Sequence, residues 1–238
     1  MSFLILVRHG QSIWNLEKRF TGWVDVDLTE NGELEAKKAG ELIKKMNIKI
    51  DAYYSSLQLR AKNTLKIIQK ILNEEDKDFS KIWQLNERHY GALTGLNKIE
   101  TINKIGEKKV HELRRSWDTR PEPLNKESPY HPNNIDTYKD LPKEIIPHTE
   151  SLKDTYIRVT KFYEDVLKND LKTKNILVSA HGNSIRALCK FLFKLDNEQI
   201  SKLEIPTGNP LVLEIDNHYN IQNCKYLDQD RAKDLVIF

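Results

Sequence analysis

The stretch LILVRHGQSIWN, residues 4–15, is the part of the sequence that decides the fold. The apolar run at its start predicts a short buried strand. The strand leads directly into Arg8, His9 and Gly10, and a cationic and a titratable side chain are unusual so close to a core. In a sheet covered by helices, ligands bind beyond the carboxyl ends of the strands. We therefore treat Arg8 and His9 as candidates for a functional site.

The same pattern returns late in the chain. NILVSA, residues 175–180, predicts a second apolar strand, and His181, Gly182 and Asn183 follow it. A single His-Gly pair fits an ordinary strand end as well as it fits a functional site. If the two strands are neighbours, both imidazoles face one small pocket, and the recurrence favours a reactive site.

Elsewhere the hydrophobic pattern alternates between helices and strands. We expect helices within 27–47, where Thr29 is the N-cap, and at about 58–73, 98–118 with a break near Gly106, 151–168 and 184–194. We expect strands at about 3–9, 51–56, 81–87, 175–180, 210–216 and 221–227. Strands joined by crossover helices predict a three-layer α/β/α fold with a mostly parallel central sheet.

The length predicts one domain. The 238 residues, of which 39% are hydrophobic, can bury one substantial core, so we expect a single domain over 1–238. Six of the eight prolines fall between Pro121 and Pro147, which predicts a long loop or lid at about 121–147. A charged tail with an apolar tip follows at about 228–238.

The charge pattern bears on partners and location. The 38 basic and 35 acidic residues are interspersed and leave a net charge of +3, which argues against a nucleic-acid surface or a basic membrane patch. No apolar run reaches the roughly 18 residues of a membrane span, and the N-terminus lacks the basic lead of a secretory signal. We expect a cytoplasmic protein in which Cys189 and Cys224 are reduced thiols without a metal-binding or redox spacing.

Two histidines and an arginine suit phosphoryl transfer. A neutral imidazole is a good nucleophile toward phosphorus. The group in transfer spreads negative charge over its oxygens, which guanidinium forks and a second imidazole stabilise. Ten of the 38 basic residues are arginine, among them Arg8, Arg60, Arg114 and Arg115. Read alone, Arg60 fits a solvated helix position equally well, and the adjacent pair fits a charged helix face better.

Six motifs together closely resemble a known family. LVRHGQSIWN, FTGW, LNERHYGALTGLNK, RRSWD, AHGNSIRAL and IPTGNPLV are similar to the motifs of the cofactor-dependent phosphoglycerate mutases, within the histidine phosphatase superfamily. The resemblance runs from about residue 3 to residue 227. The RHG triplet alone marks only the superfamily, whereas LNERHYGALTGLNK and the arginine pair narrow it to the mutase branch.

The resemblance implies a role for each matching position. It makes His9 the nucleophile that becomes phosphohistidine, Glu87 the general acid and base, and Arg8, Arg60 and His181 the cluster around the phosphoryl group. Read alone, Glu87 is an ordinary exposed carboxylate, and a tyrosine at position 90 is more often a packing residue. The positions implied to contact substrate are Arg8, Ser12, Asn15, Thr21, Gly22, Arg60, Glu87, Tyr90, Lys98, Arg114, Arg115, Gly182 and Asn183.

The resemblance also implies an activity. It predicts the glycolytic and gluconeogenic interconversion of 3-phosphoglycerate and 2-phosphoglycerate, through a phosphohistidine and a 2,3-bisphosphoglycerate intermediate. 2,3-Bisphosphoglycerate is then also the primer that phosphorylates His9, and no metal is expected, because the sequence contains no carboxylate and histidine cluster typical of a metal site. The expected partners are small phosphoglycerates, with no nucleic acid or membrane, and the resemblance is compatible with a homodimer or homotetramer.

Retention of the intermediate requires that water is kept from the phosphohistidine. We expect the insert at about 121–147 and the short C-terminal tail to cover the site. Two other functions stay open at this point. A hydrolase would use water as the second substrate, and a non-catalytic binding module would be expected to lack one of the catalytic residues, all of which are present. A bisphosphoglycerate synthase uses the same groups and differs only in how the pocket partitions the intermediate.

Overall fold

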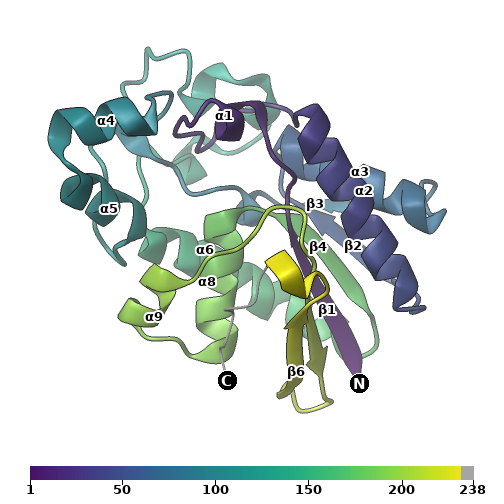
Figure 1. Ribbon diagram of the computed structural model, residues 1–238. Coiled ribbons are helices and arrows are strands. Elements are labelled where there is room, and N and C mark those ends of the chain that lie inside the picture. Colours follow the sequence, from purple (N-terminus) through teal and green to yellow (C-terminus); the bar gives the residue numbers. More distant parts are fainter. Residues whose placement is uncertain (232–238) are drawn as a thin grey trace.

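The computed structural model describes residues 1–231, and a six-stranded sheet lies at its centre (Figure 1). The strand order is β3-β2-β4-β1-β5-β6. The strands are β1 (Ser2–Arg8), β2 (Ala52–Ser55), β3 (Ser80–Lys81), β4 (Ile176–Ala180), β5 (Leu211–Ile215) and β6 (Ile221–Tyr226).

The sheet is parallel from β3 to β1 and antiparallel from β1 to β6. β1 pairs in parallel with β4, β4 with β2 and β2 with β3, whereas β5 and β6 add antiparallel strands on the other side of β1. The prediction of a mostly parallel sheet is therefore confirmed. The register places Arg8 opposite Ala180, so the residues after β1 and β4 emerge side by side at one edge.

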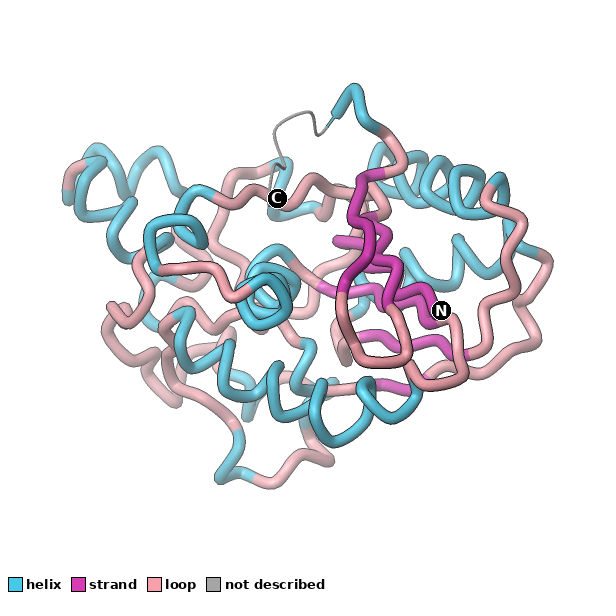
Figure 2. The backbone as a smooth tube through the Cα atoms, turned by 90° about the horizontal axis from the view of Figure 1, so that it is seen from below, coloured by secondary structure: helices cyan, strands magenta, loops and turns pink. Residues whose placement is uncertain are grey.

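Helices cover both faces of the sheet. In Figure 1, α2 (Glu30–Lys45) and α3 (Leu59–Leu72) lie on one side, and α6 (Leu152–Phe162) and α8 (Gly182–Phe193) lie on the other. The view from below shows the same layers (Figure 2). The shorter helices are α1 (Ile13–Leu16), α4 (Lys98–Ile105), α5 (Glu107–Arg115), α7 (Lys168–Asp170) and α9 (Asn197–Lys202).

The apolar run in β1 is continuous because both of its faces are buried. Leu4 and Leu6 pack in the cluster that includes α6 and α8, whereas Ile5 and Val7 pack in the cluster that includes α2 and α3. This is the pattern of a central strand between two helical layers. At the start of α2, the Thr29 side chain accepts a hydrogen bond of 3.1 Å from the Gly32 amide, which confirms the predicted N-cap.

The predicted strand at 81–87 is wrong beyond its start. Only Ser80 and Lys81 pair with β2, and the chain then turns into the 3₁₀ helix η1 (Trp83–Leu85). Further along the chain, hydrogen bonds accepted by side chains take the place of backbone pairing with β2. The Asn86 side-chain oxygen accepts from the Leu57 amide at 3.0 Å, and the Gln58 side-chain oxygen accepts from the Glu87 amide at 2.8 Å. These contacts draw Glu87 toward the edge of the sheet where β1 and β4 end.

Two further differences concern helices. Helix α9 was not expected, although Asp196 and Gln199 form a capping box that marks its start. The helix predicted at 151–168 contains a π-helical turn, η6 (Tyr163–Leu167), between α6 and α7. The short 3₁₀ turns are η2 (Gly91–Leu93), η3 (Pro132–Asn134), η4 (Asp136–Tyr138), η5 (Lys143–Ile145) and η7 (Gln229–Arg231).

The proline-rich insert packs against the loops that carry site residues. The buried Tyr138 hydroxyl donates to the Trp23 carbonyl and accepts from the Gln58 side-chain amide at 3.1 Å. The Tyr130 ring lies against Trp14, with 5.3 Å between ring centroids. The insert thus packs against the segments that contain Trp14, Trp23 and Gln58.

The start of the C-terminal tail lies beside α2. Asp228 pairs with Lys38 at 2.5 Å, and Arg231 pairs with Glu35 at 3.2 Å. The prediction that the tail covers the site concerns mainly residues 232–238, which lie outside the described part. Cys189 and Cys224 are both free thiols, as predicted. No helix within 1–231 is long and apolar enough to cross a membrane.

Candidate active site

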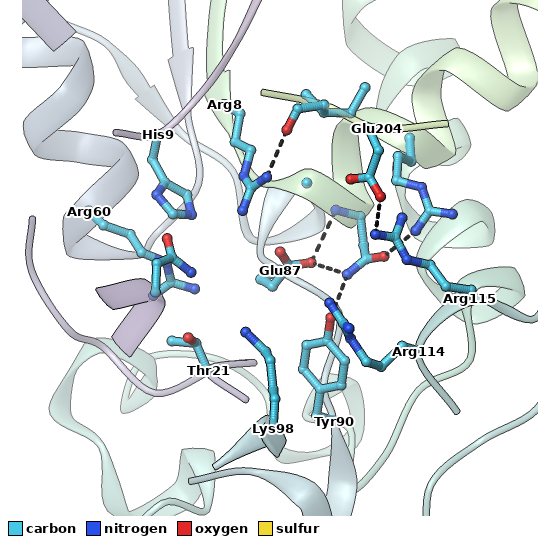
Figure 3. Close-up of a pocket in the computed structure, with 15 residues that line it drawn as sticks. Arg8, His9, Thr21, Arg60, Glu87, Tyr90, Lys98, Arg114, Arg115 and Glu204 are labelled. Atoms are coloured by element: carbon cyan, nitrogen blue, oxygen red, sulfur yellow. Dashed lines mark hydrogen bonds and ion pairs between the residues drawn. The ribbon is translucent and has the colours of Figure 1, made fainter. Parts of the chain in front are cut away.

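The two histidines predicted from the strand ends lie together. The His9 amide donates to the Ala180 carbonyl at 3.0 Å, which ties the end of β1 to the end of β4. The His9 and His181 rings are in edge contact, with 4.9 Å between centroids, and both side chains are buried. His9 lines a cavity of about 130 Å³, shown in Figure 3.

His9 is held in the form of a nucleophile. Its Nδ1 lies 2.7 Å from the Gly10 carbonyl oxygen. A carbonyl only accepts, so Nδ1 bears the proton and Nε2 keeps a lone pair. Burial, together with the nearby Arg60 and Arg8 guanidinium groups, holds the pKa of His9 well below its usual range. The ring is therefore neutral at neutral pH.

Arg8 and Arg60 are fixed by backbone carbonyls. Arg8 Nη1 donates to the Ile205 carbonyl at 2.7 Å. Arg60, in the first turn of α3, donates to the carbonyls of Val24 and Gly22 at 2.9 and 3.0 Å. Neither guanidinium group forms a salt bridge to a carboxylate in the described chain, so both keep their positive charge available beside His9.

Glu87 is oriented by hydrogen bonds to one carboxylate oxygen. Its Oε1 accepts from the Asn183 side-chain amide at 2.9 Å, from the Asn183 backbone amide at 3.3 Å and from the Arg88 amide at 2.7 Å. The same Asn183 side chain donates to the Tyr90 hydroxyl at 3.1 Å. Asn183 lies in the first turn of α8, so the helix that follows His181 also positions the carboxylate.

The cavity wall opposite His9 is strongly cationic. Figure 3 shows Arg114 and Arg115, at the end of α5, across the cavity from His9, with Lys98 at its lower edge. Burial and the neighbouring Arg114 and Arg8 lower the pKa of Lys98 despite the opposing effect of Tyr90. Arg115 forms an ion pair with Glu204. Crowded cations with few carboxylates indicate a site for a ligand with several negative charges.

Unpaired donors support this assignment. The buried Nε atoms of Arg8, Arg114 and Arg186 have no hydrogen-bond partner among the described residues. All three residues line the cavity, so their guanidinium groups can donate to an anion bound there.

Most of the predicted site residues border this cavity. The ones that line it are Arg8, His9, Asn15, Thr21, Arg60, Glu87, Tyr90, Lys98, Arg114, Arg115, Gly182 and Asn183. His181 lies behind His9, with its Nε2 2.7 Å from the Ser56 hydroxyl oxygen. No residue of the insert at 121–147 lines the cavity, so the structure does not place the insert as its cover.

Two predicted substrate contacts lie outside the cavity lining. The Ser12 hydroxyl caps α1 by accepting from the Asn15 amide at 3.3 Å, and Ser12 is fully buried. Gly22 has a positive φ of 53°, and its carbonyl holds Arg60 and the Gln58 side chain. A glycine suits this turn because the left-handed conformation is strained for other residues. Both residues shape the site through their neighbours.

Three residues of the cavity were missed by the sequence analysis: Arg186, Glu204 and Ile205. Arg186 follows Asn183 by three positions, which places both on one face of α8, and this helical spacing was the available signal. Glu204 and Ile205 lie in a loop, where no periodic pattern marks them. Within residues 1–231, no group of three or more His, Cys, Asp or Glu side chains is arranged to hold a metal ion.

Comparison with known proteins identifies the family of the chain. The family model described as histidine phosphatase superfamily (branch 1) matches residues 4–134 and 125–224. A relative from Pelagibacter ubique (strain HTCC1062), named 2,3-bisphosphoglycerate-dependent phosphoglycerate mutase, is 68% identical over 239 residues, which cover 100% of both chains. The chain belongs to this mutase family. The family prediction made from the six motifs is thus confirmed.

Two further proteins are similar to this chain, one in sequence and one in fold. A mutase of the same name from Hydrogenobaculum sp. (strain Y04AAS1) is 45% identical over 238 residues, covering 99% of this chain and 96% of that protein. Among solved structures, mycobacterial glucosyl-3-phosphoglycerate phosphatase complexed with VO3 has a TM-score of 0.69 at 20% identity, covering 95% and 97% of the two chains. At that identity the likeness shows a shared fold, which confirms the predicted fold class.

Proposed function

We propose that this mutase-family protein interconverts 3-phosphoglycerate and 2-phosphoglycerate, a step shared by glycolysis and gluconeogenesis. One observation carries the proposal: a buried, neutral His9 presents a free Nε2 in the same cavity as the carboxylate of Glu87. A nucleophile for phosphorus and a group that exchanges a proton with the substrate oxygen are the two functions that the reaction requires.

The cavity fits 2,3-bisphosphoglycerate as the primer. This molecule carries two phosphate groups and a carboxylate, and the cations that line the cavity include Arg8, Arg60, Lys98, Arg114 and Arg115. Arg8 and Arg60 would hold one phosphate beside His9, while Lys98, Arg114 and Arg115 would hold the remaining anionic groups. When bound, the primer supplies the phosphoryl group that charges His9.

In the first transfer, phosphorylated His9 gives its phosphoryl group to the free 2-hydroxyl of 3-phosphoglycerate. The bond between Nε2 and phosphorus breaks, a phosphorus–oxygen bond forms, and Glu87 takes the hydroxyl proton. The bisphosphate then reorients in the cavity so that its 3-phosphate lies beside His9. In the second transfer, Nε2 attacks the phosphorus on the 3-oxygen, that phosphorus–oxygen bond breaks, and Glu87 returns the proton to the leaving oxygen. The product is 2-phosphoglycerate, and His9 is phosphorylated again.

The surrounding cations stabilise the group in transfer. Arg8 and Arg60 stand beside His9 and keep fixed positions through backbone carbonyls, so they need little reorganisation as charge develops. His181, whose ring contacts that of His9, completes the proposed catalytic group from outside the cavity lining, with its Nε2 at the Ser56 hydroxyl. This arrangement supports His9, Glu87, His181, Arg8 and Arg60 as the catalytic group.

A coupled assay for 2-phosphoglycerate tests the proposal. The wild type, with 2,3-bisphosphoglycerate added, should form 2-phosphoglycerate, whereas His9→Ala should not. His218→Ala, which removes an exposed histidine, is the matched control and should retain full activity. Activity should also persist with a strong chelator. Steady phosphate release without 2-phosphoglycerate would identify a hydrolase instead, and equal activity of wild type and His9→Ala would exclude the phosphohistidine route.

A further inference from the structure

Arg186 lines the cavity, yet it has no role in the mechanism above. The side chain lies on α8 and is only 3% exposed. Its Nη1 donates to the Asn183 side-chain oxygen at 3.0 Å, one turn back along the helix. Its Nη2 donates to the Ile200 carbonyl in α9. The guanidinium group is thus fixed by one contact within α8 and one contact with α9.

The contact with Arg186 determines which way the Asn183 amide faces. A guanidinium group can only donate hydrogen bonds, so the amide oxygen must face Arg186. The amide NH₂ then faces the opposite side, where it donates to Glu87 Oε1 at 2.9 Å and to the Tyr90 hydroxyl at 3.1 Å. In the reversed orientation, the amide oxygen would face the Glu87 carboxylate and repel it.

We propose that Arg186 is a positioning residue that holds the Glu87 carboxylate for proton transfer by fixing the orientation of the Asn183 amide. This inference rests on the proposed function, because it assigns Glu87 the proton transfer. Burial, with Arg115 and Arg88 nearby, lowers the pKa of Arg186 to about 9, so the group remains charged and donor-only at neutral pH.

A different role for Arg186 makes different predictions. Its Nε is buried without a partner among the described residues, and a direct bond from Nε to a substrate oxygen would contribute mainly to binding. Loss of Arg186 would then raise KM and act independently of Asn183. A positioning role instead lowers kcat, and its effect disappears when Asn183 is absent.

A double-mutant cycle separates the two roles. Arg186→Met, Asn183→Ala and the double variant are compared with the wild type by kcat and KM for 3-phosphoglycerate. We expect Arg186→Met alone to lower kcat by about 10-fold to 100-fold with less than about a threefold change in KM. In the Asn183→Ala background, the same substitution should change kcat by less than about twofold.

Matched variants guard against a general loss of structure. Lys190→Met removes another α8 cation that donates to a backbone carbonyl, that of Leu195, and should leave kcat unchanged. Arg186→Lys retains a donor toward Asn183 and should recover most of the lost kcat. If Arg186→Met does not fold, Arg186→Gln replaces it in the cycle, because glutamine can present an acceptor to the amide and no longer enforces its orientation.

The outcomes separate the inference from the proposed function. Absence of 2-phosphoglycerate formation by the wild type would refute the proposed function itself. An active wild type with independent, multiplicative effects of Arg186→Met and Asn183→Ala on kcat, or with a change confined to KM, would overturn the positioning role alone. A folded Arg186→Lys as slow as Arg186→Met would also overturn it.

Discussion

The imidazole rings of His9 and His181 lie with their centroids 4.9 Å apart, although 172 positions separate the two residues in the sequence. The contact follows from the pairing of β1 with β4 at the centre of the sheet. Burial, Arg60 and the other ring hold the pKa of His181 well below its usual range, as burial and Arg60 do for His9. Two neutral rings beside two guanidinium groups suit attack on a phosphate ester.

Arg60 should be irreplaceable by lysine. Its two Nη atoms are held by the carbonyls of Val24 and Gly22, a geometry that a single ammonium cannot reproduce. We expect Arg60→Lys to lower kcat about 100-fold, the usual effect of losing one transition-state donor. Rapid-quench measurement of His9 phosphorylation provides the check. Arg120→Lys, at an exposed ion pair with Asp154, should match the wild type, and equal rates for both variants would contradict the role of Arg60.

The central part of the site was predictable because strands and helix starts leave local patterns. Because both strands are buried on two faces, each appears in the sequence as an apolar run. The ends of these runs predicted that His9 and His181 lie at the edge of the sheet. Glu87 and Tyr90 came from the family resemblance, because their neighbourhood is irregular chain whose shape depends on distant partners such as Gln58. The strand prediction failed at the same place for the same reason.

The cationic wall was only partly predictable. Arg114 and Arg115 were identified through their motif, but Arg186 reaches the cavity because α8 packs beside α9, a helix absent from the predicted elements. Glu204 reaches it through a loop that no periodic pattern describes. Long-range packing therefore decides which polar residues meet, even where the sequence specifies each element.

The Tyr138 hydroxyl should contribute measurably to stability. It joins the insert to the Trp23 carbonyl and to the Gln58 side chain, and all three residues are fully buried or nearly so. Tyr138→Phe removes the hydroxyl partner of the Trp23 carbonyl and one of the partners of the Gln58 side-chain amide, and it should reduce the free energy of unfolding by about 1–3 kcal/mol. Urea denaturation gives the value. Tyr130→Phe, in the same insert, is the control, because the Tyr130 ring packs on Trp14 and the substitution keeps the ring. If Tyr130→Phe lost as much stability as Tyr138→Phe, the loss could not be assigned to the hydroxyl contacts of Tyr138.

Glu204 should weaken substrate binding. Its carboxylate lines the cavity and pairs with Arg115, so it competes with an anionic substrate for that cation. We expect Glu204→Gln to lower KM for 3-phosphoglycerate by about twofold to fivefold, with a smaller difference at high salt. Steady-state kinetics at two salt concentrations measures this. Glu198→Gln, at an exposed pair with Lys202, should not change KM, and a KM that rises in Glu204→Gln would show that the carboxylate instead orients Arg115 for binding.

His89 should make the protein less stable in mild acid. Burial, followed by the effects of His131, His148 and Arg158, lowers the pKa of His89 to about 3, whereas the unfolded chain has the ordinary value of 6.5. Below that value the unfolded state binds a proton that the folded state excludes. The contribution of His89 to stability is therefore complete above about pH 6.5 and decreases by about 1.4 kcal/mol per pH unit as the pH falls toward 3.

The variant His89→Asn tests this linkage. Asparagine retains an acceptor for the Gly91 amide, which now donates to His89 Nδ1 at 3.0 Å, but it cannot titrate. Between pH 7.5 and 5.5, urea denaturation should show that the wild type loses about 1.4 kcal/mol more stability than the variant. His111→Asn, at an exposed position on α5, should retain the pH dependence of the wild type. Equal pH dependence in the wild type and His89→Asn would mean that His89 becomes protonated in the folded protein, which its buried position opposes.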